Sequence, residues 1–215
     1  FPVSSYLSSD GKIQFDPLAY AVSECHSKGI ALHAWVNPLR VSVKKSDSRE
    51  AALSALPQDK GAALSPELLV FYGDGKLYYN AGVPEVCELV KKCVTEIVEN
   101  YDVDGIVFDD YFYPYPTYGA EFDDADAYAK YGNGAERDDW RRENINMIIK
   151  ACHDGIKAIR SNCKFGVAPF GIWQNDNGSN KGSETSRVFF SLLRCLGVGT
   201  RRICGLSVAA ALLGI

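Results

Sequence analysis

The sequence predicts an α/β fold that is built on parallel strands. Three apolar runs of strand length recur along the chain, at residues 30–36, 105–108 and 164–168. Each run is followed by a loop with aromatic and polar side chains, and stretches with helical periodicity lie between the runs. Because parallel strands need a crossover connection, usually a helix, this alternation is typical of βαβ units. Three such units are visible, which is fewer than the eight that close a barrel.

The first unit begins with a helix and continues into a strand. Asp16 and Pro17 supply an N-cap and a first-turn proline for a helix that runs to about Lys28. Residues 30–36 follow and are apolar enough for a buried strand. Asn37-Pro38 ends this strand, because proline cannot extend a ladder of hydrogen bonds.

The middle of the chain predicts a long excursion and a hairpin. Residues 39–66 are polar and irregular apart from a short helix predicted near residues 49–55. Loops of this length in compact domains are usually functional or disordered. Residues 69–72 and 76–79 then flank a Gly-Asp-Gly turn, which predicts a β-hairpin.

The remaining elements are two long helices and two strands. Pro84 opens the clearest helix, in which the apolar residues fall on one face. Residues 105–108 form the second strand, and a loop rich in Tyr and Pro follows. A helix over about residues 138–161 leads to the third strand at residues 164–168.

Charge and hydropathy exclude two classes of partner. The net charge is −4 and the pI is about 5.4, whereas proteins that bind nucleic acid usually present a basic face. No apolar run reaches the 18 residues that a transmembrane helix needs. The sequence therefore predicts neither a nucleic-acid partner nor a transmembrane segment.

The cysteines predict buried free thiols rather than a metal site or disulfides. No two of them form a CxxC pair, and three fall on the apolar faces of predicted helices. We therefore expect no metal and no cofactor. The seven positions are Cys25, Cys87, Cys93, Cys152, Cys163, Cys195 and Cys204.

Candidate functional residues follow the strands, because reactive side chains of parallel barrels gather at the carboxyl ends of strands. The first strand ends with Trp35, Asn37 and Arg40, which bring an aromatic ring, an amide and a guanidinium close together. His33 lies inside this strand. It is a candidate substrate contact, and the alternative is a hydrogen-bonded core histidine.

The second strand ends in two adjacent carboxylates, Asp109 and Asp110, followed by the aromatic residues Tyr111 and Tyr113. Neighbouring residues on a strand point to opposite sides, so at most one carboxylate faces the barrel axis. A carboxylate against aromatic walls is desolvated, and the resulting rise of its pKa suits it to acid or nucleophile chemistry. The alternative is an Asp pair that caps a turn.

The third strand ends in a turn that carries Phe170 and Trp173 next to amide side chains. A buried aromatic anchor under a loop would explain either residue alone. Three consecutive strand ends with aromatic and polar residues are a stronger indication, because aromatic rings stack on the apolar faces of sugars. These ends together predict a carbohydrate site.

The motifs at these strand ends resemble the family-10-like glycosyl hydrolases. The segment VDGIVFDDYFYP at residues 103–114 is the closest match. LHAWVNPLR at 32–40, LYYNAG at 77–82 and FGVAPFGIW at 165–173 follow the family in the same order. Leu39 and Ala81 depart from the family pattern, which has an aromatic residue and a proline there.

The resemblance implies a (β/α)8 TIM barrel that hydrolyses bacterial polysaccharides, including peptidoglycan glycan strands without stem peptides. It implies that Asp109 or Asp110 is the leading catalytic carboxylate, and that Asn37, Arg40, Asn80 and Trp173 are sugar contacts. The partner is therefore a polysaccharide or oligosaccharide. It also implies an extracytoplasmic location, although no signal peptide is present in this chain.

Both ends of the chain differ from the family, so we expect a partial TIM barrel that lacks its N-terminal and C-terminal units. Residues 1–186 form the expected partial catalytic domain. Residues 187–215 contain no acidic residue, and codons permitted for them, read one base later, yield a Pro-Gln-x-Tyr-Trp motif of the family. The tail is thus expected to be out of frame. We expect this chain on its own to be insoluble or inactive, because an open parallel sheet exposes its edges.

Two other functions fit parts of the sequence. A non-catalytic glycan-binding module would use the same aromatic loops. A metal-dependent hydrolase would use His33 with Asp109, although the sequence lacks any HxH or HxxE pair. For a hydrolase, the second carboxylate could be Glu121 or Glu184, or could lie outside this chain.

Overall fold

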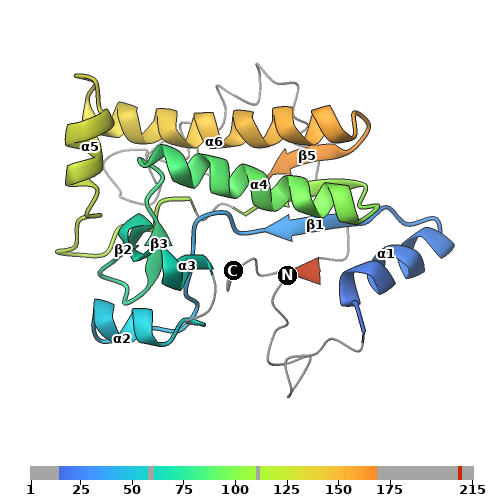
Figure 1. Ribbon diagram of the computed structural model, residues 1–215, viewed down its shortest axis with the longest axis horizontal. Helices are drawn as coiled ribbons and strands as arrows, with labels where there is room; N and C mark the ends of the chain where they lie inside the picture. The colour runs from blue at the N-terminus through green and yellow to red at the C-terminus, as the bar shows by residue number, and fades with distance from the viewer. Residues whose placement is uncertain (1–14, 58–60, 110–111, 169–207, 210–215) are drawn as a thin grey trace, which may run out of the picture.

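A computed structural model describes residues 15–57, 61–109, 112–168 and 208–209 of the chain (Figure 1). These residues form a mixed α/β structure around a parallel sheet, as the sequence predicts. The sheet has the order β5-β4-β1-β6, and every pair in it is parallel. Its strands are β1 (His33–Val36), β4 (Gly105–Phe108), β5 (Lys164–Val167) and β6 (Val208–Ala209).

The first helix, α1 (Pro17–Ser27), has the start that the sequence predicts. The Asp16 carboxylate accepts hydrogen bonds from the backbone N–H groups of Leu18 and Ala19, both at 3.0 Å. These two N–H groups have no partner within the helix, so the side chain stabilises the first turn. Ser48 caps the short helix α2 (Arg49–Ser54) in the same way, through the N–H of Ala51.

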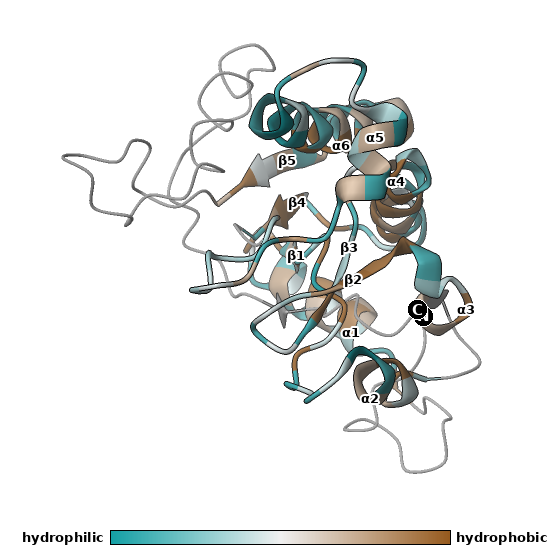
Figure 2. Ribbon diagram, turned by 90° about the vertical axis from the view of Figure 1, so that its left-hand side faces the viewer, coloured by the Kyte–Doolittle hydropathy of each residue, from teal (hydrophilic) through white to brown (hydrophobic). Residues whose placement is uncertain are grey.

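Helices α4 (Pro84–Asn100) and α6 (Arg137–Ile159) lie side by side and pack on one face of the sheet (Figure 1). Every second strand residue enters this layer, so the main core contains Ala34 and Val36 of β1 together with Ile106 and Phe108 of β4. The ribbon of β4 is hydrophobic along its length, whereas α6 is hydrophilic on its outer side (Figure 2). Burial of this apolar face is therefore what fixes the helices to the sheet.

The predicted hairpin is present as β2 (Leu69–Phe71) and β3 (Leu77–Tyr79), which pair antiparallel. It is joined to the end of β1, because the N–H of Tyr79 donates to Leu39 O at 2.8 Å and the N–H of Val41 donates to Leu77 O at 2.9 Å. One face of the hairpin packs on α2, and its other face packs on Phe122. The hairpin thus fixes the chain that leaves the carboxyl end of β1.

Several elements differ from the sequence prediction. The strand predicted from residue 30 begins only at His33, and Ile30 is 48% exposed. Four short elements were not predicted, and each is too short to show a clear hydrophobic period. They are the helix α3 (Gly61–Leu64), the 3-10 helix η1 (Pro66–Leu68), the helix α5 (Ala125–Tyr131) and the strand β6.

The predicted tail contributes β6, which pairs with β1 through Ala34–Val208 and Trp35–Ala209. The predicted loop over residues 169–186 lies outside the described residues, and the domain boundary at residue 186 stays a prediction. Across the part of the chain that the structure describes, no helix has the length and apolar character to span a membrane. The five cysteines that it describes are free thiols, and Cys152 and Cys163 are buried.

Candidate functional site

Asp109 lies at the carboxyl end of β4, where the sheet continues one residue beyond the strand. Its N–H donates to Val36 O at 2.9 Å, and the N–H of Ala168 donates to Phe108 O at 2.9 Å. Strand residues alternate between the two faces, and Phe108 belongs to the helix-covered face. This alternation assigns Asp109 to the opposite face, which in a barrel is the face toward the axis.

Asn37 is the direct neighbour of Asp109 across the sheet. The register pairs Val36 with Phe108, so the next residue on each strand is Asn37 and Asp109, with backbones about 5 Å apart. Asn37 is 8% exposed, and its Oδ1 accepts from the N–H of Arg40 at 3.1 Å. Its Nδ2 has no acceptor among the described residues. A buried donor without a partner is costly, so this amide is available to a ligand beside the carboxylate.

Trp35 and Arg40 lie on either side of Asn37. Trp35 pairs with Val107 and is half-buried on the face away from α4 and α6. Arg40 pairs with Tyr78 of the hairpin through an antiparallel bridge. The hairpin therefore holds the backbone of Arg40 near the end of β1, and Trp35 and Asn37 lie on the same face of the sheet as Asp109.

Asn80 lies in the turn between β3 and α4. It is 7% exposed, and its Oδ1 accepts from the N–H of Gly82 at 3.0 Å while its backbone O accepts from the N–H of Val83 at 3.0 Å. An Asn side chain that bonds to the backbone two residues on forms an Asx turn. The described contacts thus give Asn80 a role in the turn that starts α4.

Tyr113 is held inside the loop that follows β4. Its ring packs edge-on against Phe122 at 5.2 Å, and the Arg141 guanidinium lies 5.7 Å from the ring centre. Burial raises the pKa of Tyr113 above its ordinary value. These contacts make Tyr113 a packing residue and give its predicted sugar contact no support.

His33 lies at the opposite end of β1 from Asn37, which corrects its predicted place at the site. It pairs with Gly105, and Asp109 lies four residues beyond Gly105, or about 13 Å along the sheet. Metal ligands lie about 2 Å from their ion, so His33 and Asp109 cannot share a metal. Within the described ranges no group of three or more His, Cys, Asp or Glu side chains is placed to hold a metal ion.

A buried ion-pair cluster, which sequence reasoning missed, closes the loop after β4. The Asp124 side chain has no exposed surface and accepts from Arg137 Nη2 at 2.5 Å and from Arg141 Nε at 2.7 Å. Both arginines also donate to Phe122 O. The sequence offered one signal for this cluster. Arg137 and Arg141 lie one helical turn apart, 13 and 17 positions after Asp124.

The remaining candidates are placed as follows. Glu121 pairs with Arg137 at 2.7 Å and is 73% exposed, so its described contact is with the loop cluster. Five predicted residues lie outside the described residues: Asp110, Tyr111, Phe170, Trp173 and Glu184.

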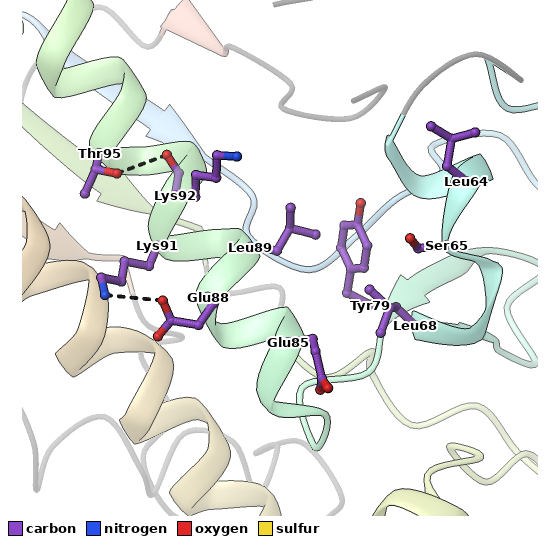
Figure 3. A pocket seen from close by; sticks show the side chains of 10 residues that line it. All are labelled: Leu64, Ser65, Leu68, Tyr79, Glu85, Glu88, Leu89, Lys91, Lys92 and Thr95. Atoms are coloured by element: carbon purple, nitrogen blue, oxygen red, sulfur yellow. Dashed lines mark hydrogen bonds and ion pairs between the residues drawn. The ribbon is translucent and has the colours of Figure 1, made fainter.

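An apolar hollow of about 620 Å³ separates α4 from η1 and α3 (Figure 3). Leu64, Leu68, Leu89 and Tyr79 line it, and Lys91 pairs with Glu88 at 3.3 Å on its rim. Burial raises the pKa of Tyr79 to about 12. Its walls contain none of the predicted strand-end residues, so it is separate from the Asp109 edge.

Comparison with known proteins gives consistent matches. The glycosyl hydrolase-like 10 family matches residues 5–190. The chain is 40% identical over 188 residues to Glycosyl hydrolase YngK of Bacillus subtilis (strain 168), which covers 86% of this chain and 36% of that protein. It is 36% identical over 174 residues to Glycosyl hydrolase DigH of Escherichia coli (strain K12), which covers 80% of this chain and 39% of that protein.

The chain thus spans less than two fifths of the length of each of these relatives. Among solved structures, Alpha-L-fucosidase isoenzyme 2 from Paenibacillus thiaminolyticus aligns with a TM-score of 0.49 and 16% identity, over 78% of this chain and 25% of that one.

Proposed function

Because the chain belongs to the glycosyl hydrolase-like 10 family, we propose that it carries part of the catalytic (β/α)8 barrel of a glycoside hydrolase. The proposed substrate is a bacterial polysaccharide, with peptidoglycan glycan strands as the first candidate. The proposed place of action is outside the cytoplasm, as in the family that the sequence resembles. The relatives named as glycosyl hydrolases support the class of reaction.

The observation that carries this proposal is the position of Asp109. It follows a buried parallel strand, on the face away from the helices, next to Asn37, whose Nδ2 has no acceptor in the part of the chain that the structure describes. In parallel barrels this end of the sheet is where catalytic side chains gather. Trp35 lies two residues before Asn37 on the same face of the sheet and provides a ring for the apolar side of a sugar.

In the proposed reaction, one carboxylic acid protonates the glycosidic oxygen while a second carboxylate attacks the sugar or activates water. Asp109 takes one of these roles. Asn37 donates from Nδ2 to a sugar hydroxyl and so fixes the sugar ring beside the carboxylate. Asp110 is a candidate for the second role. The second carboxylate can also belong to a part of the protein outside these residues.

The test is hydrolysis by the full-length product of the gene, with purified glycan strands free of stem peptides as substrate. We expect Asp109→Asn to lower kcat by roughly 10²- to 10⁴-fold, because an amide cannot exchange the proton. The matched control is Asp123→Asn, which changes an exposed carboxylate in the loop before α5. New reducing ends measure the rate.

Three outcomes separate the alternatives. Equal rates in Asp109→Asn and in the unaltered protein would remove Asp109 from the reaction. A greater loss in Asp110→Asn would transfer the leading role to its neighbour. Binding of the strands with no turnover in any form would favour the non-catalytic glycan-binding module.

A further inference from the structure

A tight turn over residues 117–120, in the loop between β4 and α5, presents a tyrosine ring to solvent. The N–H of Ala120 donates to Thr117 O at 3.0 Å, and Gly119 has a φ of 73°, which is the geometry of a type II turn. Tyr118 is the residue at the tip of this turn. Its side chain is 106% exposed, so no described part of the protein packs on the ring.

The backbone of the turn is fixed to the tip of the hairpin. Tyr72, the residue after β2, is buried, and its hydroxyl accepts from the N–H of Thr117 at 3.0 Å. Gly73 lies against the other end of the turn, where a Cβ on this glycine would be 2.3 Å from the Ala120 Cβ. The Tyr72 ring also packs on Phe122, with 6.1 Å between the centroids. The chain is therefore held on both sides of the exposed ring.

An exposed ring on a fixed backbone is suited to binding. A type II turn does not require an aromatic side chain at its first central position, where proline is common. The fold therefore gives no reason for the ring of Tyr118. Tyrosine has only two side-chain torsions, so a ligand that stacks on it costs little conformational entropy. The ring is thus suited to a flat ligand that reaches the turn from solvent.

The turn lies on the same side of the sheet as Asp109, but further out. Figure 1 shows the hairpin and α5, the elements next to this loop, on the side toward which the arrow of β1 points. The N–H of Tyr79 donates to Leu39 O close to the end of β1. Gly75 in the hairpin tip is four residues from Tyr79, or about 13 Å of extended chain. A sugar on the Tyr118 ring would therefore be a different unit of the polymer from the sugar at Asp109.

We infer that Tyr118 forms an outer subsite, where its ring stacks on one sugar unit of a polymer whose other units extend to Asp109. The C–H face of a pyranose ring is flat and apolar and matches the face of a tyrosine ring, while the sugar hydroxyls and the tyrosine hydroxyl stay in water. The inference rests on the proposed function, since a polymeric substrate is needed to reach from Asp109 to the turn. The outer subsite would make the protein bind long strands more tightly than short ones.

The experiment compares long and short ligands on the full-length product that carries Asp109→Asn, so that cleavage is suppressed. Calorimetric titration measures the dissociation constants of purified glycan strands free of stem peptides and of the single disaccharide prepared from them. With Tyr118→Ala added, we expect the dissociation constant of the strands to rise about tenfold, because the stacked ring no longer covers apolar surface. The dissociation constant of the disaccharide is expected to stay unchanged, since a disaccharide at Asp109 does not reach the turn.

Further variants test stacking itself. Tyr118→Trp keeps an aromatic face and is expected to bind the strands as tightly as the tyrosine does. Tyr72→Phe removes the hydroxyl that holds Thr117, so it should weaken strand binding, though less than Tyr118→Ala, because the turn is less well fixed. Tyr20→Ala is the matched control, because this 54% exposed tyrosine lies on α1, away from the hairpin (Figure 1). Circular dichroism spectra verify that each variant is folded.

The outcomes distinguish this inference from the proposed function. Equal strand affinity with and without Tyr118→Ala overturns the outer subsite, and turnover of strands by the unaltered protein still supports the hydrolase. A loss that Tyr118→Trp does not restore, or an equal loss for the disaccharide, also overturns it. A loss confined to the strands, with no turnover in any form, supports the outer subsite and contradicts the hydrolase.

Discussion

The two ends of the parallel sheet differ in the neighbours of their carboxylates. At the amino end, Asp104 accepts from His26 Nε2 at 2.9 Å and from the N–H of Leu32 at 2.7 Å. Arg160 bonds there to Asp102 and to three backbone oxygens. At the carboxyl end, the Asn37 Nδ2 beside Asp109 has no acceptor among the described residues.

This difference separates structure from function in a fold of this kind. At the amino end, the bonds of Asp104 and Arg160 connect the chain before β4 with the chain before β1 and the chain before β5. A buried donor next to a carboxylate costs free energy when it lacks a partner, and a ligand or an ordered water can regain that free energy. Within the described residues, the Asp109 edge is therefore the candidate site for a reaction on a sugar.

The largest expected effect on stability is at the buried cluster of the carboxyl end. Asp124→Asn removes the charge that two arginines share, and we expect it to lower the free energy of unfolding by about 3 kcal/mol, since an unpaired buried charge remains. The matched control is Asp139→Asn, whose 65% exposed side chain pairs with Arg142 on the surface. Its expected cost is below about 1 kcal/mol. Urea unfolding of the full-length product measures both.

A loss of similar size in the two variants would contradict this difference. It would mean that Asp124 contributes no more than a surface ion pair. In that case the loop from β4 to α5 would be held by the packing of Tyr113 and Phe122 instead.

The fold could largely be predicted from the sequence, because its main elements have strong local signals. Pro84 and a one-sided apolar face predict α4 and its first residue, and the Gly-rich turn predicts the hairpin. The helix α5 has seven residues and could not be predicted, because two turns give no clear period. Its position is set by tertiary contacts, chiefly the ion pairs of Asp124 with α6.

The candidate site could be predicted only in part. Chain order alone indicates that Asn37 and Asp109 lie at one edge, because parallel strands align their carboxyl ends. The candidates that the described geometry does not support are those whose surroundings come from distant parts of the chain. His33, predicted inside the strand, is its first residue and so lies far from the carboxyl end. Tyr113 is enclosed by Phe122 and Arg141, which follow it by nine and 28 positions.

A smaller effect is expected from crowding at the amino end. A Cβ at Gly105 would lie 2.8 Å from His33 Nδ1 and 2.9 Å from the backbone O of Lys164, so Gly105→Ala should cost about 1–3 kcal/mol. Gly166→Ala, on the neighbouring strand and the same face, meets nothing within 4 Å and should cost nothing. Comparable urea midpoints for the two variants would show that the amino end is more loosely packed than described.

The smallest expected effect is on the pH dependence of stability, and it concerns His33, whose Nδ1 is buried with no hydrogen-bond partner among the described residues. Burial lowers the pKa of His33, and Lys164 adds to this while Asp104 opposes it. As the pH falls through about 6.5, the unfolded chain therefore binds a proton that the folded chain does not, so stability decreases. His33→Gln should remove part of this decrease between pH 7 and 5, as measured by urea unfolding at each pH. An unchanged slope would mean that the His33 ring accepts its proton equally well in the folded protein, and the amino end would then be fully paired or open to water.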